Sequence, residues 1–347
     1  MIFRQLFDGV SCTYTYIIAS RAGGEALIID PVLEKVDRYI QLLHELDLKL
    51  VKAIDTHLHA DHISGLGALR DRTQCVTLMG EQSNVDVVSM RVGEDDVVDI
   101  EGVGLKAIYT PGHTQDSYSF LMEGAVFTGD TLFIRGTGRT DFQQGDPTAQ
   151  YDSLFNKLLK LPEDTLVYPG HDYKGDTVST IGEEKRFNPR LQVSSVDEYA
   201  DIMNNLDLAD PKMMDVAVPA NMRIGMSQDE LDERGLSLDV RNAAEWLDSE
   251  KVVLADLRDG RERKQHGVIE GSVHAPYGEL SENIRPGGML YELIKATGKQ
   301  LVFYCAYGER SAMAVLAAQG TGIERSRHVK GGIDAWKKAD LPLRSPE

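Results

Sequence analysis

The chain has 347 residues, of which 42% are hydrophobic and 27% charged, an ordinary globular composition at a length that suits two domains. Its formal net charge of -18 repels phosphate backbones, so we do not expect nucleic-acid binding. No apolar run reaches the roughly 18 residues of a membrane span, and the N-terminus lacks the pattern of a signal or transit peptide. We therefore expect a cytoplasmic protein that does not enter a membrane.

The first half of the chain alternates apolar, β-branched runs with segments of helical spacing, a pattern typical of a layered α/β fold. Residues 1–8 alternate like a strand, and we predict further strands at residues 15–18, 26–29, 51–55, 105–109, 119–122, 126–128 and 166–168. We predict helices at residues 33–46, 152–161 and 196–206. Most of these strands end in a polar or glycine-containing turn, where functional side chains commonly lie.

A polar and charged segment at residues 225–235 precedes a second α/β pattern. This pattern predicts strands at residues 252–256 and 300–304 and helices at residues 289–296 and 311–318. We predict a first domain at residues 1–225, a linker at residues 226–235 and a second domain at residues 236–347.

Metal-ligand residue types are concentrated just after the strand at residues 51–55, in the motif Thr56-His57-Leu58-His59-Ala60-Asp61-His62. Histidine supplies a neutral nitrogen ligand and aspartate an anionic oxygen. Further candidates follow other predicted strands: His113 in a Pro-Gly-His turn, Asp130 in a Thr-Gly-Asp-Thr turn, and His171 in a second Pro-Gly-His turn. Because such turns meet beyond the strand ends of an α/β fold, the motifs predict one metal centre.

This set resembles the metallo-β-lactamase superfamily, whose pattern is His-x-His-x-Asp-His followed by His, Asp and His. The resemblance covers about residues 1–225 and implies an αββα sandwich with the metal at the sheet edges. Within the superfamily, the stretch Phe-Ile-Arg-Gly-Thr-Gly-Arg-Thr-Asp-Phe-Gln-Gln-Gly at 133–145 is similar to the persulfide dioxygenase family. Asn-Pro-Arg-Leu at 188–191 and Val-Pro-Ala-Asn-Met at 218–222 match that family too.

The resemblance implies one Fe(II) per chain, held by His57, His113 and Asp130 as a facial triad that leaves positions open for O₂ and substrate. The other residues of the pattern would then orient these ligands or remain from a second metal site; they are His59, Asp61, His62 and His171. From the residues alone a second metal stays open, because the ligands of a two-metal hydrolase are all present.

The substrate implied by the resemblance is glutathione persulfide, oxidised by O₂ to sulfite and glutathione. Glutathione carries carboxylates, so cations are expected near the site despite the acidic chain. Arg139 and Arg190 match family positions near the substrate, and Tyr173 stands two residues after His171. The alternative for each is a structural role, such as an Arg–Asp pair with Asp141 or Asp172.

A second constellation follows the strand at residues 300–304. Cys305 opens a loop, Ala306-Tyr307-Gly308-Glu309-Arg310, that leads into a helix. Backbone N–H groups of such a loop can converge on one anion, and the helix N-terminus favours negative charge, so we expect Cys305 to lose its proton readily. Arg310 would help to hold the anion. Cys12 and Cys75 lack these surroundings, and we interpret both as structural.

The segment around this loop resembles a rhodanese-like domain over about residues 236–347. The resemblance rests on Asp-Leu-Arg at 256–258, on His-Gly-Val-Ile-Glu-Gly-Ser at 266–272 and on Gly-Gly-Ile-Asp-Ala-Trp at 331–336. It implies an α/β domain with a parallel sheet, in which Cys305 accepts a sulfane sulfur and passes it on. Thiosulfate, sulfite and glutathione are the implied partners.

Two alternatives remain for the function. The first domain could be a zinc hydrolase similar to glyoxalase II that cleaves a glutathione thioester. The rhodanese-like domain could be a sulfur carrier or redox sensor that docks to a partner protein. The sequence also leaves open whether the chain forms a homodimer.

Overall fold

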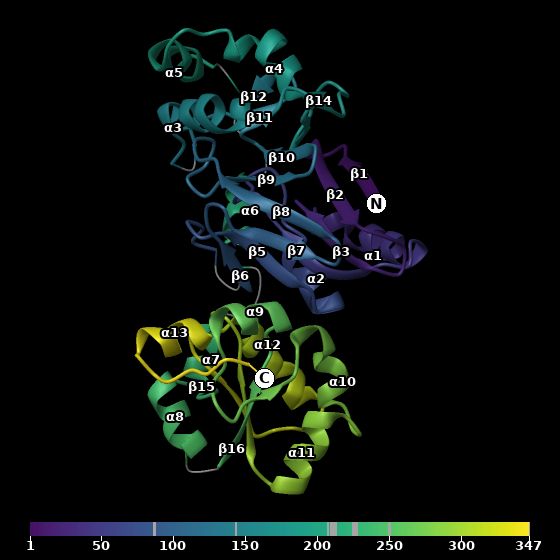
Figure 1. Cartoon of the computed structure of the whole chain (residues 1–347), viewed down its shortest axis with the longest axis vertical. Coiled ribbons are helices and arrows are strands. Elements are labelled where there is room, and N and C mark those ends of the chain that lie inside the picture. The colour runs from purple at the N-terminus through teal and green to yellow at the C-terminus, as the bar shows by residue number, and fades with distance from the viewer. Residues whose placement is uncertain are drawn as a thin grey trace. The chain divides into compact units, whose positions relative to one another are not determined.

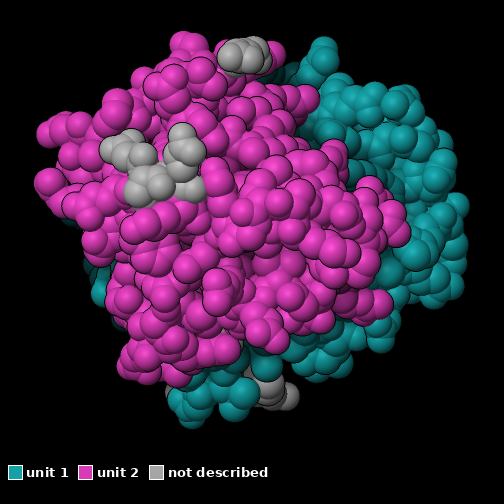
Figure 2. All heavy atoms as spheres, turned by 90° about the horizontal axis from the view of Figure 1, so that it is seen from below, with its two compact units in different colours: residues 1–70, 77–85, 91–222 teal, residues 71–76, 86–90, 223–347 magenta. Residues whose placement is uncertain are grey.

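The computed structural model describes residues 1–85, 88–142, 144–206, 208, 214–223, 228–248 and 251–346. The chain forms two compact units, which Figure 2 shows in different colours. The first unit comprises Met1–Arg70, Thr77–Val85 and Arg91–Met222, and the second comprises Asp71–Val76, Asp86–Met90 and Arg223–Glu347.

The elements up to residue 223 are β1 (Ile2–Asp8), β2 (Thr13–Ala19), β3 (Glu25–Ile29), η1 (Leu33–Lys35), α1 (Val36–Glu45), β4 (Lys49–Ile54), α2 (Leu66–Thr73), β5 (Val76–Gly80), β6 (Met90–Val92), β7 (Val97–Ile100), β8 (Val103–Tyr109), β9 (Tyr118–Met122), β10 (Ala125–Gly129), β11 (Leu132–Phe133), β12 (Gly136–Thr137), α3 (Pro147–Asp152), η2 (Ser153–Lys157), η3 (Leu158–Lys160), β13 (Leu166–Pro169), β14 (Ser179–Thr180), α4 (Ile181–Phe187), η4 (Pro189–Leu191), α5 (Val196–Asn204) and α6 (Met214–Asn221) (Figure 1).

The elements after residue 223 are α7 (Gln228–Glu233), β15 (Ser237–Leu238), α8 (Val240–Asp248), β16 (Val252–Asp256), α9 (Gly260–His266), β17 (Val273–His274), η5 (Tyr277–Glu279), α10 (Leu280–Ile284), α11 (Met289–Thr297), β18 (Gln300–Tyr304), α12 (Glu309–Gly320), β19 (Ser326–Val329) and α13 (Gly332–Lys338).

Two six-stranded sheets form the first unit, in the orders β1-β2-β3-β4-β5-β6 and β14-β13-β10-β9-β8-β7. Aromatic rings join their inner faces. Phe3 of β1 lies 4.9 Å from Tyr168 of β13, and Tyr16 of β2 lies 5.0 Å from Phe127 of β10, between ring centroids. Since side chains alternate along a strand, the neighbour Thr15 faces the other way. The sheets therefore pack face to face, as predicted.

Helices cover the outer faces of both sheets. Thr15 of β2 bonds Tyr39 of α1 at 2.9 Å between hydroxyl oxygens. On the other sheet, Val126 and Val167 share a buried cluster with Leu154 and with residues of α4 and α5. These layers give the αββα sandwich that the sequence predicted.

The second unit contains a five-stranded sheet in the order β15-β19-β18-β16-β17, in which all neighbouring strands are parallel. Its strands β16 and β18 are apolar and almost wholly buried, as expected when helices cover both faces of a parallel sheet. Both strands have the predicted bounds.

Two predicted segments differ most from the structure. The helix expected at residues 152–161 begins earlier, because Asp146 caps α3 by accepting from the N–H of Thr148 and Pro147 suits the first turn. Part of the expected linker lies outside the described residues, at 226–227. The residues that follow in the expected linker form helix α7. Its one apolar side chain, Leu231, is fully buried, so this polar segment packs as a helix and is not an extended linker.

No helix among the described residues is long and apolar enough to cross a membrane.

Candidate active sites

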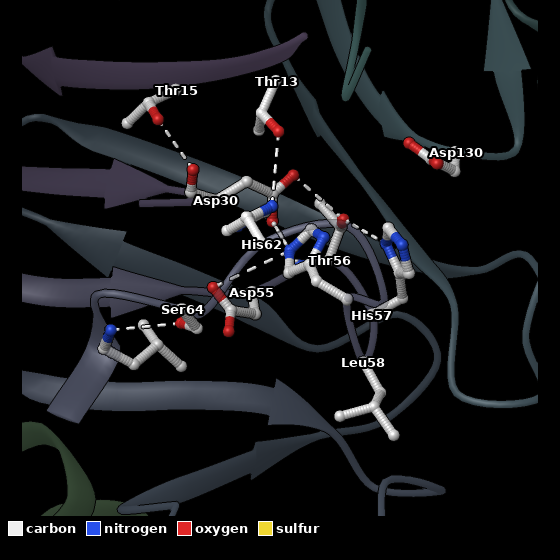
Figure 3. A network of polar contacts seen from close by, with 12 residues as sticks. Thr13, Thr15, Asp30, Asp55, Thr56, His57, Leu58, His62, Ser64 and Asp130 are labelled. Carbon is white, nitrogen blue, oxygen red and sulfur yellow. Dashed lines mark hydrogen bonds and ion pairs between the residues drawn. The ribbon is translucent and has the colours of Figure 1, made fainter. Parts of the chain in front are cut away.

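The histidine motif occupies the loop after β4, and Asp30 at the end of β3 holds the start of that loop. The Asp30 carboxylate accepts the N–H of Thr56 at 2.7 Å and its hydroxyl at 3.0 Å. Strands β3 and β4 are parallel neighbours, so their ends reach the same sheet edge. Figure 3 shows Asp30 beside Thr56 and His57. The sequence analysis missed Asp30, because nothing near it in the sequence marks it as part of the site.

Hydrogen bonds fix the ring orientation of the first two expected ligands. The Thr56 hydroxyl donates to Asp30 and so accepts from Nδ1 of His57 at 2.9 Å. Nδ1 of His113 donates to the carbonyl oxygen of Arg139 at 2.7 Å. In both rings Nε2 is therefore left for a metal. Burial lowers the pKa of His57 well below its ordinary value, which keeps the ring neutral as a ligand must be.

Asp130 follows β10 and faces His113, with Oδ2 and Nε2 3.6 Å apart. Its other oxygen, Oδ1, lies 2.6 Å from Nδ1 of His171. Burial raises the pKa of Asp130, but His171 and the other histidines lower that pKa by more. The net effect holds the pKa below its ordinary value, so Asp130 is an ionised carboxylate. The second nitrogen of His171 bonds Asp61 at 2.7 Å. His171 thus orients Asp130 with both nitrogens engaged.

These side chains fit a metal ion. One ligand atom each from His57, His113 and Asp130 lie within 4.8 Å of one another. The set comprises two neutral nitrogens and one anionic oxygen, and hydrogen bonds to neighbouring groups hold each ligand. A two-histidine, one-carboxylate set with open positions suits non-haem Fe(II).

A second group of donors lies beside the first. His59, Asp61 and His62 also place ligand atoms within 4.8 Å of one another. Among the described atoms, Nδ1 of His59 and Nε2 of His62 are buried without a hydrogen-bond partner. The geometry therefore retains donors for a second metal, as the sequence left open.

Two residues far apart in the sequence hold the loop after β4 that carries the histidine motif, here called the metal loop. Thr13, at the start of β2, places its hydroxyl 3.1 Å from Asp61 Oδ2 and 3.0 Å from His171 Nε2. Asn221, at the end of α6, donates to the carbonyls of His59 at 3.0 Å and His62 at 2.8 Å and accepts the N–H of Ser64 at 2.8 Å. Sequence reasoning found Asn221 only as part of a family match and gave it no role.

The expected substrate residues surround this centre in different ways. Arg139 forms a two-pronged pair with Asp141, both contacts being 2.7 Å, which is the structural alternative foreseen for it. Arg190 donates to the carbonyl and hydroxyl oxygens of Thr137. The Tyr173 ring stacks on His171, with centroids 6.1 Å apart, and its side chain is largely exposed. Arg139 reaches an expected metal-site residue through its backbone carbonyl, which accepts from His113, and Tyr173 does so through its ring.

The second candidate site lies in the second unit, between β18 and α12. Cys305 is fully buried, and the N–H of Gly308 donates to its Sγ at 3.1 Å. The Ser311 hydroxyl lies 3.8 Å from the same sulfur. Loop residues Ala306, Tyr307, Gly308 and Glu309 surround the thiol, and the helix begins at Glu309, two residues earlier than predicted.

The positive charge of Arg310, expected to hold an anion beside the thiol, is paired with a carboxylate in the structure. Arg310 is fully buried and bonds both carboxylate oxygens of Glu262, at 2.8 and 2.6 Å. Its Nε is buried without a hydrogen-bond partner among the described atoms. Burial raises the pKa of the Cys305 thiol, although Arg310 and backbone N–H groups lower it. Burial of the thiol thus opposes the expected loss of the proton, while Arg310 and the loop N–H groups favour it.

Known proteins resemble both parts of the chain. The metallo-beta-lactamase superfamily model matches residues 8–83 and 81–171, and the rhodanese-like domain model matches residues 231–339. The mouse mitochondrial persulfide dioxygenase ETHE1 is 45% identical over 229 residues, which are 65% of this chain and 89% of that protein. The human protein of that name is 44% identical over the same length.

Solved structures agree with these matches. The crystal structure of ETHE1 from Myxococcus xanthus has a TM-score of 0.63 and 52% identity, covering 64% of this chain and 98% of that one. A metallo-beta-lactamase from Staphylococcus aureus has a TM-score of 0.61 at 22% identity and covers 95% of this chain, which bears on the fold alone. The chain belongs to the persulfide dioxygenase family of the metallo-beta-lactamase superfamily and carries a rhodanese-like domain after it.

Proposed function

We propose that the first unit oxidises glutathione persulfide at one Fe(II), with O₂ and water as co-reactants and sulfite and glutathione as products. The observation that carries the proposal is the ligand set His57, His113 and Asp130. Both histidines leave Nε2 for the metal, because Nδ1 of each is engaged elsewhere. When bound, the iron would supply adjacent positions for the terminal sulfur and for O₂.

The protein side chains would hold and orient the reactants. His171 keeps Asp130 ionised and turned toward His113. Arg139, Arg190 and Tyr173 are proposed to bind the glutathione portion of the substrate. Because Arg139 already pairs with Asp141, we expect a glutathione carboxylate to compete for this guanidinium.

For the second unit we propose sulfur transfer between thiosulfate and glutathione through Cys305. The Cys305 thiolate attacks the outer sulfur of thiosulfate, the sulfur–sulfonate bond breaks, and sulfite leaves with the electron pair. Glutathione thiolate then takes the terminal sulfur, and Cys305 leaves as a thiolate. Arg310 and the loop residues 306–309 would hold the anion.

The two activities are proposed to share glutathione persulfide as intermediate. We assign oxidation to residues 1–225 and sulfur transfer to residues 236–347, in a cytoplasmic enzyme. Covalent tethering raises the local concentration of an intermediate that passes between sites. Whether two chains associate as a homodimer is a prediction that sedimentation of the purified protein tests.

Metal analysis of anaerobically purified protein, followed by O₂ uptake on adding glutathione persulfide, tests the oxidation. We expect about one iron per chain, and O₂ uptake that His113→Ala abolishes and Cys305→Ser preserves. Thiosulfate-dependent sulfur transfer should show the opposite pattern. Two zinc ions and no O₂ uptake would overturn the proposal for the first unit.

A second candidate for the first unit is a zinc thioester hydrolase of glyoxalase II type, with the second unit as a sulfur carrier. The buried, unpartnered nitrogens of His59 and His62 favour it, because they would serve a second metal. Hydrolysis of a glutathione thioester by the two-metal form would establish it.

A further inference from the structure

The first four backbone carbonyl groups of the loop that begins at Cys305 all accept hydrogen bonds from residues outside those four. From Cys305 to Gly308, each backbone carbonyl accepts from a donor beyond the loop's first four residues: Cys305 from the N–H of Ile333 at 2.9 Å, Ala306 from the N–H of Asp334 at 3.1 Å, Tyr307 from Nε2 of Gln228 at 2.9 Å, and Gly308 from the N–H of Ala312 at 2.9 Å. Three of these donors are backbone groups. The donor to Tyr307 is a side chain.

The Tyr307 carbonyl is in the same peptide group as the N–H that touches the catalytic sulfur. A trans peptide points its C=O and N–H in opposite directions. Gln228 holds the carbonyl of Tyr307 outward, and the N–H of Gly308 therefore points inward, 3.1 Å from Cys305 Sγ.

The residue at the second half of this peptide, Gly308, restrains it little. Gly308 has a φ of +104°, in the region that favours glycine, and it lacks the side chain that would restrict rotation. A Cβ built on Gly308 would lie 2.0 Å from Oε1 of Gln228. The Gln228 amide thus fills the space that a side chain at residue 308 would need.

Gln228 is itself anchored on both sides. Its Oε1 accepts the N–H of Gly331 at 2.7 Å, which ties it to the turn before α13. Helix α7 is docked by Lys330, which pairs with Asp229 at 2.8 Å and Asp232 at 2.9 Å. The rhodanese-like match begins at residue 231, so Gln228 precedes the matched domain.

We propose that Gln228 is a positioning residue for sulfur transfer: its amide fixes the Tyr307–Gly308 peptide so that the Gly308 N–H donates to the sulfur anion of Cys305. The proposal rests on the sulfur-transfer function proposed above. The N–H stabilises Sγ before it attacks a sulfane sulfur. It stabilises Sγ again when an acceptor thiolate removes that sulfur and Cys305 departs with the electron pair.

The rate of Cys305 alkylation by iodoacetamide, followed peptide by peptide in the full chain, tests the proposal without requiring sulfur transfer. Gln228→Met removes both side-chain hydrogen bonds while keeping a side chain of similar size. Gln228→Glu keeps the acceptor for Gly331 and loses the donor to Tyr307, and the uncharged Gln228→Met shows how much of its effect comes from the added charge. Gln319→Met, at the far end of α12, is the matched control.

We expect the alkylation rate near neutral pH to fall about tenfold in Gln228→Met and Gln228→Glu, the effect of one hydrogen bond to an ionised group. In both, the pH profile should move to higher pH, and kcat for sulfur transfer should fall with little change in KM. Gln319→Met should match the wild type. Rates within about twofold of wild type in both variants, with melting temperatures unchanged, would overturn the proposal.

The two proposals fail in different ways. A wild-type chain whose Cys305 alkylates as expected but transfers no sulfur would refute the sulfur-transfer function and leave the role of Gln228 in the thiol environment intact. If Gln228→Glu behaves like the wild type and only Gln228→Met is slow, the bond to Gly331 alone matters, and the peptide-orientation proposal is wrong.

Discussion

The backbone carbonyl of Arg139 accepts the Nδ1 hydrogen of His113, the proposed metal ligand, at 2.7 Å, while the guanidinium of the same residue pairs with Asp141. Arg139 therefore orients His113 through its backbone, and its side chain remains a proposed substrate contact. Substitution of the side chain leaves the first of these contacts in place.

Arg139→Lys should separate metal binding from substrate binding. Lysine keeps the carbonyl that orients His113 but cannot form the two-pronged contact with a carboxylate. We expect the iron content to stay at the wild-type level and KM for glutathione persulfide to rise by about tenfold, the cost of one charged hydrogen bond. Metal analysis together with O₂-uptake kinetics measures both. Loss of iron would instead mean that the guanidinium pair supports the His113 turn.

Gly138 is expected to be essential for the metal site, whereas Gly136 is not. A Cβ at Gly138 would lie 2.0 Å from the carbonyl oxygen of Asp130 and 3.0 Å from the His113 ring. A Cβ at Gly136 meets nothing closer than 3.8 Å. Gly138→Ala should therefore lose most bound iron while Gly136→Ala keeps it. Equal iron content in the two purified variants would contradict this view of the site.

Asn221→Leu should destabilise the metal loop, because Asn221 bonds the backbone of that loop. The substitution leaves the carbonyls of His59 and His62 and the N–H of Ser64 buried without their partner. We expect a loss of about 3 kcal/mol or more in the stability of the first unit and faster iron release to a chelator. Asn205→Leu, at the exposed end of α5, should change stability by no more than about 0.5 kcal/mol. Denaturant unfolding and chelator kinetics make the comparison.

The second unit should lose stability in mild acid through His328. Burial lowers the pKa of His328 to about 4; Asp232 opposes this effect and Lys330 adds to it. Between its ordinary pKa of about 6.5 and that value, the unfolded chain binds the proton more readily, so stability is complete above this window and falls as pH falls through it. The full loss is about 3 kcal/mol.

Both tryptophans, Trp246 and Trp336, belong to the second unit, so their fluorescence reports its unfolding in the whole chain. His328→Gln should reduce the pH dependence between about pH 6.5 and 4 relative to the wild type, because glutamine does not titrate. Parallel pH profiles in the two proteins would show that His328 does not carry the effect.

Much of the candidate site could be predicted because its expected ligand residues follow strands in the sequence. Local spacing pointed to His57 and Asp130 as candidates, and the strand before Cys305 was predicted with its observed bounds. Asp30, Asn221 and Gln228 could not be found in this way. Their roles depend on chain segments that meet only in the folded protein, such as Asn221 reaching His59 from 162 residues away. The raised pKa of Cys305 was missed because burial depth is not a local property.

The contacts of Thr13 and Asn221 with the metal loop join residues that are synthesised at very different times. Thr13 is synthesised well before His171, which contacts it, and before Asn221, which contacts the same loop. Long-range contacts of this kind form only after the intervening chain exists. The histidine motif is therefore synthesised long before Asn221, which holds it from 162 residues away. We expect the proposed metal site to retain a metal tightly only after Asn221 has been added, when synthesis of the rhodanese-like domain is beginning.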